Sequence, residues 1–164
     1  MEQSIKLFVA LGTQKFPFDR LINNLEKLVE SGFIDASEVL VQLNDNSYKS
    51  SIIPIVNMLP YSEFNKCIHN ATYVIVHGGV NSIISCMKMG RSFIIWPRRL
   101  QFNEHVDDHQ IEIAMLMKNK FNVLVYDEDK NLSELLKESL IHNYDSWKSS
   151  NHELLIDIEN FLLQ

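Results

Sequence analysis

Residues 72–82, TYVIVHGGVNS, contain the pattern that decides the fold of this chain. Residues 72–76 form a short apolar run rich in β-branched side chains, which is typical of a buried strand. The run continues directly into His77-Gly78-Gly79, and a helix is predicted over residues 81–89, with Gly90 as its C-terminal stop. A strand, a glycine-containing turn and a helix in this order predict the beginning of a βαβ unit.

The same alternation extends along the chain in both directions. Further strands are expected over residues 5–11, 38–43, 52–56, 93–96 and 123–126, and further helices over 17–31, 61–69, 104–118, 132–140 and 153–163. Pro54 places its strand at a sheet edge, because proline cannot donate to a central ladder. The pattern predicts an α/β fold: a Rossmann-like parallel sheet with helices on both faces. No repeat divides the chain, so residues 1–164 are expected to form a single domain.

The composition argues against some classes of function and indicates where the protein is located. The net charge of −6 argues against a nucleic-acid binder, because such proteins are usually basic. Cys67 and Cys86 have apolar neighbours and form no CxxC pair, so they are interpreted as reduced, buried thiols of a cytosolic protein. No signal peptide is expected, because residues 1–11 lack a basic start and a small-residue cleavage site. No membrane span is expected either, because no apolar stretch approaches the length that crosses a bilayer. A cytoplasmic protein is therefore expected, and its attachment to a membrane would need another protein.

Three motifs follow predicted strands, where open parallel sheets bind their ligands. They are Gly12-Thr13-Gln14, His77-Gly78-Gly79-Val80-Asn81-Ser82 and residues 97–110. In the second motif, glycines allow an anion to approach the backbone amides, and Asn81 and Ser82 are good helix-capping residues. A helix N-terminus favours a phosphate through its unpaired N–H groups and its dipole. The alternative is that the two glycines only make a tight turn.

The third motif, PRRLQFNEHVDDHQ, concentrates polar side chains at the start of a predicted helix. Arg98 and Arg99 stand at a strand end, where a fixed positive charge could meet a phosphate. Three acidic residues follow, Glu104, Asp107 and Asp108. Acidic residues favour a helix N-terminus through the dipole, so the simpler interpretation is a well-capped, solvated helix start.

A metal site is another alternative for this motif. His105 and His109 are four residues apart and would share a helix face, with Asp108 adjacent to His109. The pattern is not HExxH, and no cysteine or further histidine lies nearby in the sequence. No metal site is therefore predicted.

The three motifs together resemble a known family. FVALGTQKFPFDRL at residues 8–21, HGGVNS at 77–82 and PRRLQFNEHVDDHQ at 97–110 are similar to the C-terminal, donor-binding half of GT-B glycosyltransferases of family 28. The chain resembles most the soluble subunits of two-component transferases. These occur in bacterial exopolysaccharide and capsule assembly, and in the eukaryotic enzyme that adds the second N-acetylglucosamine to dolichol-linked oligosaccharide.

The resemblance implies a substrate, a partner and a reaction. A UDP-sugar would be the donor, and no cofactor would be needed. A membrane-anchored partner subunit would hold a polyprenyl-linked acceptor at the cytoplasmic face of the membrane. Hexose would be transferred to this acceptor with inversion, which requires a general base. His77 and Glu104 are candidates for that base, and so is a residue of the partner.

The resemblance also implies a donor site that uses all three motifs. The diphosphate would lie near residues 78–82 and the Gly12-Thr13 turn, and residues 104–110 would read the sugar hydroxyls. The expected donor-binding residues are Gly12, Thr13, Gln14, His77, Gly78, Gly79, Asn81, Ser82, Arg98, Glu104, His105, Asp108, His109 and Gln110.

Two positions depart from the pattern of the wider family. Many members have a glycine where Asn81 stands and a glutamate, associated with ribose recognition, where Ser85 stands. These departures motivate a second hypothesis, a non-catalytic subunit that binds a partner transferase and carries a degenerate nucleotide site. A third hypothesis is a free-standing small-ligand or metal protein that uses His105 and His109.

Overall fold

The computed structural model describes residues 4–44, 50–145, 156 and 160. Six strands form one sheet, and they are β1 (Leu7–Ala10), β2 (Val39–Gln42), β3 (Ile55–Val56), β4 (Tyr73–Val76), β5 (Ile94–Ile95) and β6 (Leu124–Val125). The helices are α1 (Asp19–Glu30), α2 (Tyr61–Asn70), α3 (Val80–Lys88), α4 (His109–Phe121) and α5 (Leu132–Ile141). Two short 3-10 turns, η1 (Ala36–Glu38) and η2 (Leu100–Phe102), precede β2 and α4.

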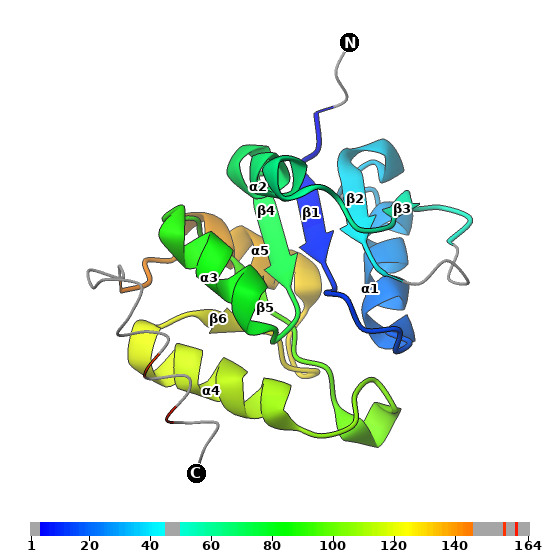
Figure 1. Cartoon of the computed structure of the whole chain (residues 1–164). Coiled ribbons are helices and arrows are strands. Elements are labelled where there is room, and N and C mark those ends of the chain that lie inside the picture. The colour runs from blue at the N-terminus through cyan, green and yellow to red at the C-terminus, as the bar shows by residue number, and fades with distance from the viewer. Residues whose placement is uncertain (1–3, 45–49, 146–155, 157–159, 161–164) are drawn as a thin grey trace.

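The sheet has the order β3-β2-β1-β4-β5-β6, and every pair of neighbouring strands is parallel (Figure 1). The predicted Rossmann-like α/β fold is therefore confirmed. From β1, the chain first builds β2 and β3 on one side and then crosses to build β4, β5 and β6 on the other. This reversal is a topological switch point, where the loops after two adjacent strands diverge and leave room for a ligand.

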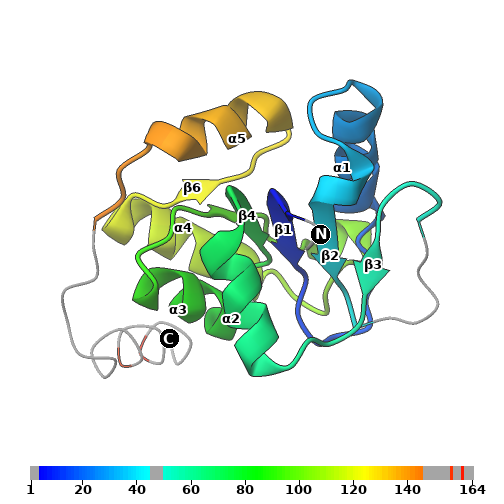
Figure 2. The same cartoon turned by 90° about the horizontal axis from the view of Figure 1, so that it is seen from above.

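Helices cover both faces of the sheet. Figure 2 shows α1 and α5 on one side of the sheet and α2 and α3 on the other. Successive side chains of a strand point to opposite faces, so Leu7 and Val9 pack into one apolar cluster and Phe8 and Ala10 into the other. Burial on both faces explains why the strands read as continuous apolar runs rather than as alternating ones.

The ends of β1 and β4 lie directly beside each other. Ala10 pairs with Val76 in the ladder, and the N–H of His77 donates to the carbonyl oxygen of Ala10 at 3.0 Å. The first and second sequence motifs therefore start from neighbouring points at the carboxyl edge of the sheet.

The predicted strands are all present, although the hydrogen-bonded ladders are shorter than expected. The strand expected over residues 52–56 is reduced to β3, which lies at an edge of the sheet as Pro54 predicted. The predicted stop of α3 is also confirmed, because Gly90 has a left-handed φ of 61° and its N–H donates to Met87 O.

The helix predicted over residues 104–118 begins later than expected. α4 starts at His109, and Asn103 before it has a left-handed φ of 56°. Residues 104–108 belong to an irregular loop, because the carboxylate of Glu104 turns inward to pair with Arg20 of α1. His105 and His109 therefore do not share a helix face, and that prediction is wrong.

Two further predictions concern the C-terminal end and the cysteines. The helix predicted over 153–163 lies outside the described residues, except for Ile156 and Asn160, which are helical. Cys67 and Cys86 are both free thiols, and Cys86 is buried, which raises its pKa. Cys67 is only half-buried, so the prediction that it is buried is wrong. Within residues 4–44 and 50–145, no helix has the length and apolar character that a membrane span requires.

Packing of α5 against the sheet should contribute strongly to stability. Leu136 is completely buried, so Leu136→Ala should lower the unfolding free energy by about 3 kcal/mol through lost burial and a residual cavity. Leu140 on the same helix is 53% exposed, and Leu140→Ala should change stability by no more than about 0.5 kcal/mol. Urea denaturation of both variants measures the difference, and equal effects would contradict this packing.

Candidate functional site

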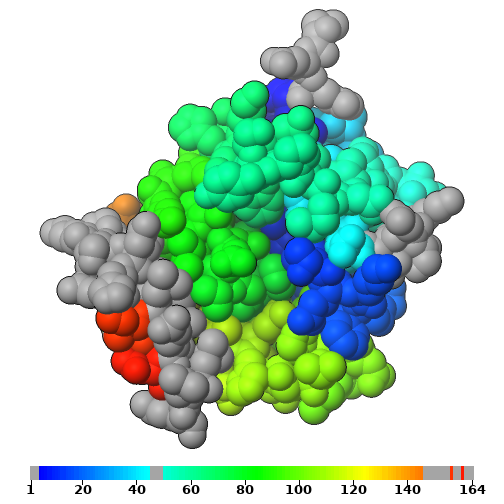
Figure 3. Space-filling model, in the orientation of Figure 1, coloured from blue at the N-terminus to red at the C-terminus, as the bar shows by residue number. Residues whose placement is uncertain are grey.

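Two cavities open beside the loops that follow β1 and β4. The first has a volume of about 360 Å³ and the second about 230 Å³. Thr13, His77, Gly79 and Val80 line both cavities, so the β4–α3 turn forms part of the wall between them. Figure 3 shows the loop after β1, α3 and the segment leading into α4 gathered on one face of the molecule. The switch point thus brings the three sequence motifs together.

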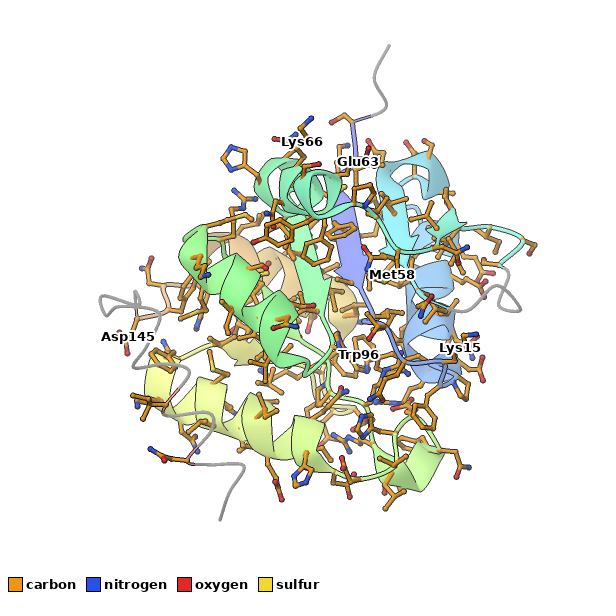
Figure 4. The ribbon with its side chains drawn as sticks, in the orientation of Figure 1. Lys15, Met58, Glu63, Lys66, Trp96 and Asp145 are labelled. Carbon is orange, nitrogen blue, oxygen red and sulfur yellow. The ribbon has the colours of Figure 1, made fainter. Side chains whose placement is uncertain are left out.

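The first cavity has a largely apolar lining. Met58 and Leu59, which connect β3 to α2, and Phe64 of α2 contribute to it. Met58, labelled in Figure 4, places its Sδ 3.5 Å from the Nε2 of Gln42 at the end of β2. The Gln42 carboxamide is buried, with 2% of the residue exposed. An apolar pocket with a few polar groups is suited to a ring such as a nucleobase.

The second cavity has a more polar lining. Gln14 comes from the loop after β1, and His105, His109 and Gln110 come from the segment around the start of α4. Most of the expected donor-binding residues line one or both cavities. In the first cavity they are Gly12, Thr13, His77, Gly79, Asn81 and Ser82. In the second they are Thr13, Gln14, His77, Gly78, Gly79, Arg98, His105, His109 and Gln110. The described residues that line these cavities do not include Glu104 or Asp108.

The N-terminus of α3 lies at the boundary between the cavities. The helix begins at Val80 with Gly79 as its N-cap residue, so the prediction that Asn81 or Ser82 caps it is wrong. No side chain in the described part of the chain caps this end, which leaves N–H groups of the first turn available. Together with the helix dipole, these groups favour an anion at this position.

The imidazole of His77 packs closely against two glycines. A Cβ atom on Gly12 would lie 2.4 Å from His77 Nε2, and one on Gly79 would lie 2.1 Å from it. The backbone of Gly79, with φ −79° and ψ 129°, suits any residue, so the close approach of the ring is what requires glycine there. The three residues form one compact unit between the two strand ends.

His77 is neutral at pH 7. Its Nδ1 lies 3.2 Å from the carbonyl oxygen of Ala10, to which it donates, so Nε2 is left as an acceptor. Burial, together with the positive charge of Arg98, lowers the pKa of His77 to about 4. His77 therefore offers a hydrogen-bonding group to the site rather than a charge.

Gln110 connects the second motif to the third. Its Oε1 accepts hydrogen bonds from the N–H groups of Gly78 and Arg98, each at 3.1 Å. A Cβ on Gly78 would lie 2.6 Å from the Cβ of Gln110, so this contact also depends on a glycine. Gln110 is predicted to bind sugar hydroxyls. Its Oε1 already accepts these two hydrogen bonds, so only its Nε2 is left to bind a ligand.

Arg98 has a different role from the one predicted. The residue is 1% exposed, and its guanidinium donates to the carbonyl oxygens of Leu11, Phe16, Pro17 and Glu104 at 3.0–3.2 Å. Burial lowers the pKa of Arg98 to about 10, against the opposing effect of Glu104, so the side chain stays charged at neutral pH. These contacts conflict with the prediction that Arg98 meets a phosphate, and its charge instead ties the surrounding loops together.

Glu104 and Asp108 also differ from their predicted roles. Arg20 donates to both carboxylate oxygens of Glu104, at 3.0 and 2.8 Å, and the N–H of Arg99 donates to Oε2 at 3.0 Å. Asp108 accepts the N–H of Leu100 at 2.9 Å and closes the loop before α4. With both oxygens paired in the interior, Glu104 is a structural residue rather than a general base or a sugar-binding group.

His105 and His109 line the second cavity from different backbone segments. Nδ1 of His105 lies 2.8 Å from Oδ1 of Asp107, and Nδ1 of His109 lies 2.9 Å from Oε2 of Glu112. The hydrogen bond to Glu112 raises the pKa of His109. Among the described residues, no group of three or more His, Cys, Asp or Glu side chains could hold a metal ion.

Sequence reasoning missed one side of the first cavity. Gln42, Met58 and Phe64 are not among the expected donor-binding residues, yet all three line it. The sequence could have indicated Gln42 as a site residue, because it is the polar residue at the carboxyl end of the otherwise apolar strand VLVQ. The sequence could not have indicated Met58 or Phe64, since an apolar residue that lines a cavity and one in the core look alike in a sequence.

The glycosyltransferase family 28 C-terminal domain matches residues 6–153 of this chain. The chain belongs to this family. Membership confirms the resemblance of this chain to the C-terminal domain of family 28 glycosyltransferases. It also fits the parallel sheet, whose strand order reverses at β1 and β4.

Individual relatives of the family 28 domain support the same assignment. Over 103 residues, or 63% of this chain, the sequence is 32% identical to the UDP-N-acetylglucosamine transferase subunit ALG13 of Candida albicans. The match covers 32% of that relative, so the chain spans about a third of its length. The fold is similar to the solution structure of ALG13, with a TM-score of 0.57 and 15% identity over 95% of both chains.

A second solved structure has the same fold. The spinosyn forosaminyltransferase SpnP matches with a TM-score of 0.53 and 17% identity, over 97% of this chain and 41% of its own. At this level of identity the similarity concerns the fold alone.

Loss of the Arg98 guanidinium should destabilise this family 28 domain. Arg98→Met would leave four backbone carbonyl oxygens without their charged donor, and the unfolding free energy should fall by about 3 kcal/mol. Arg99 pairs with Asp127 and Glu128 nearer the surface, so Arg99→Met should cost less than about 1 kcal/mol. Chemical denaturation distinguishes the two variants, and an equal cost would contradict the buried role of Arg98.

The low pKa of His77 should make stability depend on pH. Its pKa of about 4 in the folded chain lies below the ordinary value of 6.5, so the unfolded chain binds more protons between these values. The unfolding free energy should therefore fall by about 2 kcal/mol between pH 7 and pH 5 through this group. His77→Gln should remove this part of the dependence, whereas His69→Ala, at an exposed position, should retain it. Identical pH profiles for wild type and His77→Gln would refute the shift.

Proposed function

We propose that this chain is the donor-binding subunit of a glycosyltransferase. It binds a UDP-sugar and, in complex with a membrane-anchored partner, transfers a hexose to a polyprenyl-linked acceptor in exopolysaccharide or capsule assembly. The observation that carries the proposal is the uncapped N-terminus of α3, which lies between two cavities in a chain of family 28.

The diphosphate of the donor is assigned to the first turn of α3. Backbone N–H groups near Gly79 can stabilise its negative charge without a metal ion, and this stabilisation increases as the sugar bond breaks. His77, neutral and with Nε2 beside Gly12 and Gly79, adds a hydrogen-bonding group at the same place. The buried guanidinium of Arg98 donates its hydrogen bonds to the backbone, but its positive charge also favours the negative diphosphate.

The two cavities suit the two ends of such a donor. The first cavity, with Met58, Leu59 and Phe64, suits the nucleoside, and the Gln42 carboxamide provides polar recognition. The second cavity, about 230 Å³ in volume, suits a hexose and carries imidazole and carboxamide groups that bond to hydroxyls. No cofactor is proposed.

We infer the partner from the name of one relative. The relative from Candida albicans is itself called a transferase subunit. We assign the acceptor and the membrane anchor to a second polypeptide, which recruits this chain to the cytoplasmic face of the membrane.

A non-catalytic subunit is the second candidate, favoured by one observation at the nucleoside cavity. At the position where the family resemblance implies a glutamate, Ser85 donates its hydroxyl to the carbonyl oxygen of Asn81 at 3.0 Å. A subunit that bound only its partner would give no heat in a calorimetric titration with UDP. A test of UDP binding therefore distinguishes the two candidates.

Calorimetry of the isolated chain with UDP and UDP-sugars tests the proposed function. Wild type should bind both, and Gly79→Val should weaken binding by more than about tenfold, because its side chain displaces His77 and fills the space in front of the amides. Lys88→Ala, exposed at the far end of α3, serves as the matched control and should bind like wild type. Absence of heat with the wild-type chain would favour the non-catalytic candidate.

A further inference from the structure

We propose that His105 is the general base of the transfer reaction and that Asp107 is the residue that positions it. This inference rests on the proposed function and assigns a step for which the motifs offered only His77 and Glu104. It is carried by the contact between the two side chains and by the place of His105 in the wall of the second cavity.

The geometry orients the imidazole of His105. Its Nδ1 lies 2.8 Å from Oδ1 of Asp107, a contact that requires the proton on Nδ1. The N–H of Asp107 also faces Nδ1, at a longer 3.4 Å, and the shorter contact with the carboxylate decides the tautomer. In the neutral imidazole, Nε2 is then the nitrogen without a proton, and this is the atom that a base uses.

The remaining contacts hold this pair in place. The ring of His105 packs near that of Phe16, with the centroids 5.8 Å apart, and its side chain is 11% exposed. Oδ1 of Asp107 also accepts the N–H of His109 at 3.1 Å, which fixes the carboxylate to the start of α4. Burial works to raise the pKa of Asp107, but these hydrogen bonds outweigh it and the pKa is lowered, so the carboxylate is ionised at neutral pH.

The other two candidates, Glu104 and His77, are less suited to this step. Both oxygens of Glu104 accept hydrogen bonds from Arg20, and the residue is 2% exposed. His77 lines both cavities, and its ring packs against Gly12 and Gly79 beside the amides assigned to the diphosphate. Of the two cavities, His105 lines the second, which is assigned to the sugar and where the acceptor hydroxyl has to approach the anomeric carbon.

The step conserves atoms and charge. Nε2 of His105 takes the proton of the acceptor hydroxyl while the hydroxyl oxygen forms a bond to the anomeric carbon of the donor sugar. The bond between that carbon and the diphosphate oxygen breaks, and UDP leaves with the electron pair. The imidazolium that forms is stabilised by Asp107, as in other carboxylate–histidine pairs. The proton passes to solvent before the next cycle.

Steady-state kinetics of the complex with the partner subunit test this role. The probes are UDP-glucose, UDP-galactose and UDP-N-acetylglucosamine with a polyprenyl-diphosphate-linked hexose as acceptor. His105→Ala should lower kcat by about 100-fold or more, since general-base catalysis typically contributes 10²–10⁴. The Kd for UDP should stay within about twofold of wild type, and added imidazole should restore part of kcat. Asp107→Asn should lower kcat by a smaller factor without changing the KM of the donor.

Controls separate this inference from the proposed function. His69→Ala, at an exposed position on α2, should leave kcat unchanged, and urea denaturation should give His105→Ala the midpoint of wild type. Full kcat in His105→Ala, or a loss that imidazole does not restore, would overturn the role of His105 while donor binding stands. A wild-type chain that does not bind UDP would instead overturn the proposed function, and the base with it.

Discussion

The buried guanidinium of Arg98 is the interaction on which the site depends. It donates to carbonyl oxygens of the loop after β1, of the approach to α1 and of the loop before α4. A charge is costly to bury unless hydrogen bonds surround it, and these carbonyls are themselves polar groups that need donors inside the protein. The guanidinium needs acceptors and the carbonyl oxygens need a donor. Their hydrogen bonds therefore hold loops that are far apart in the sequence in one arrangement at the carboxyl edge of the sheet.

A second set of contacts extends this frame to the β4–α3 turn. Gln110 joins the backbone of Gly78 to that of Arg98, and the paired carboxylate of Glu104 fixes the loop that carries His105. Charged and polar groups in the interior thus organise the site, while the α3 amides and His105 line the cavities. A site preorganised in this way meets developing charge without rearrangement, which is the condition for electrostatic stabilisation of a transition state.

Much of the fold could be predicted from local pattern. The apolar run TYVIV and the motif HGGVNS indicate a strand, a turn and a helix, and repetition of that order indicates a parallel sheet. Proline predicted the edge strand, and glycine predicted the end of α3. The partners of charged side chains could not be predicted in this way. Arg20 lies 84 residues from Glu104 in the sequence, and no local pattern shows that they meet.

The sequence by itself determined the class of fold, the place of the three motifs at strand ends and the family. These follow from short-range periodicity and from residue types, such as glycine, that backbone conformation requires. Only the tertiary structure decided which polar groups line the cavities and which support the loops. Burial and long-range pairing turned Arg98 and Glu104 inward and left His105 and the amides of α3 at the cavities, because the desolvation of a charge depends on neighbours that the chain supplies only when it is folded.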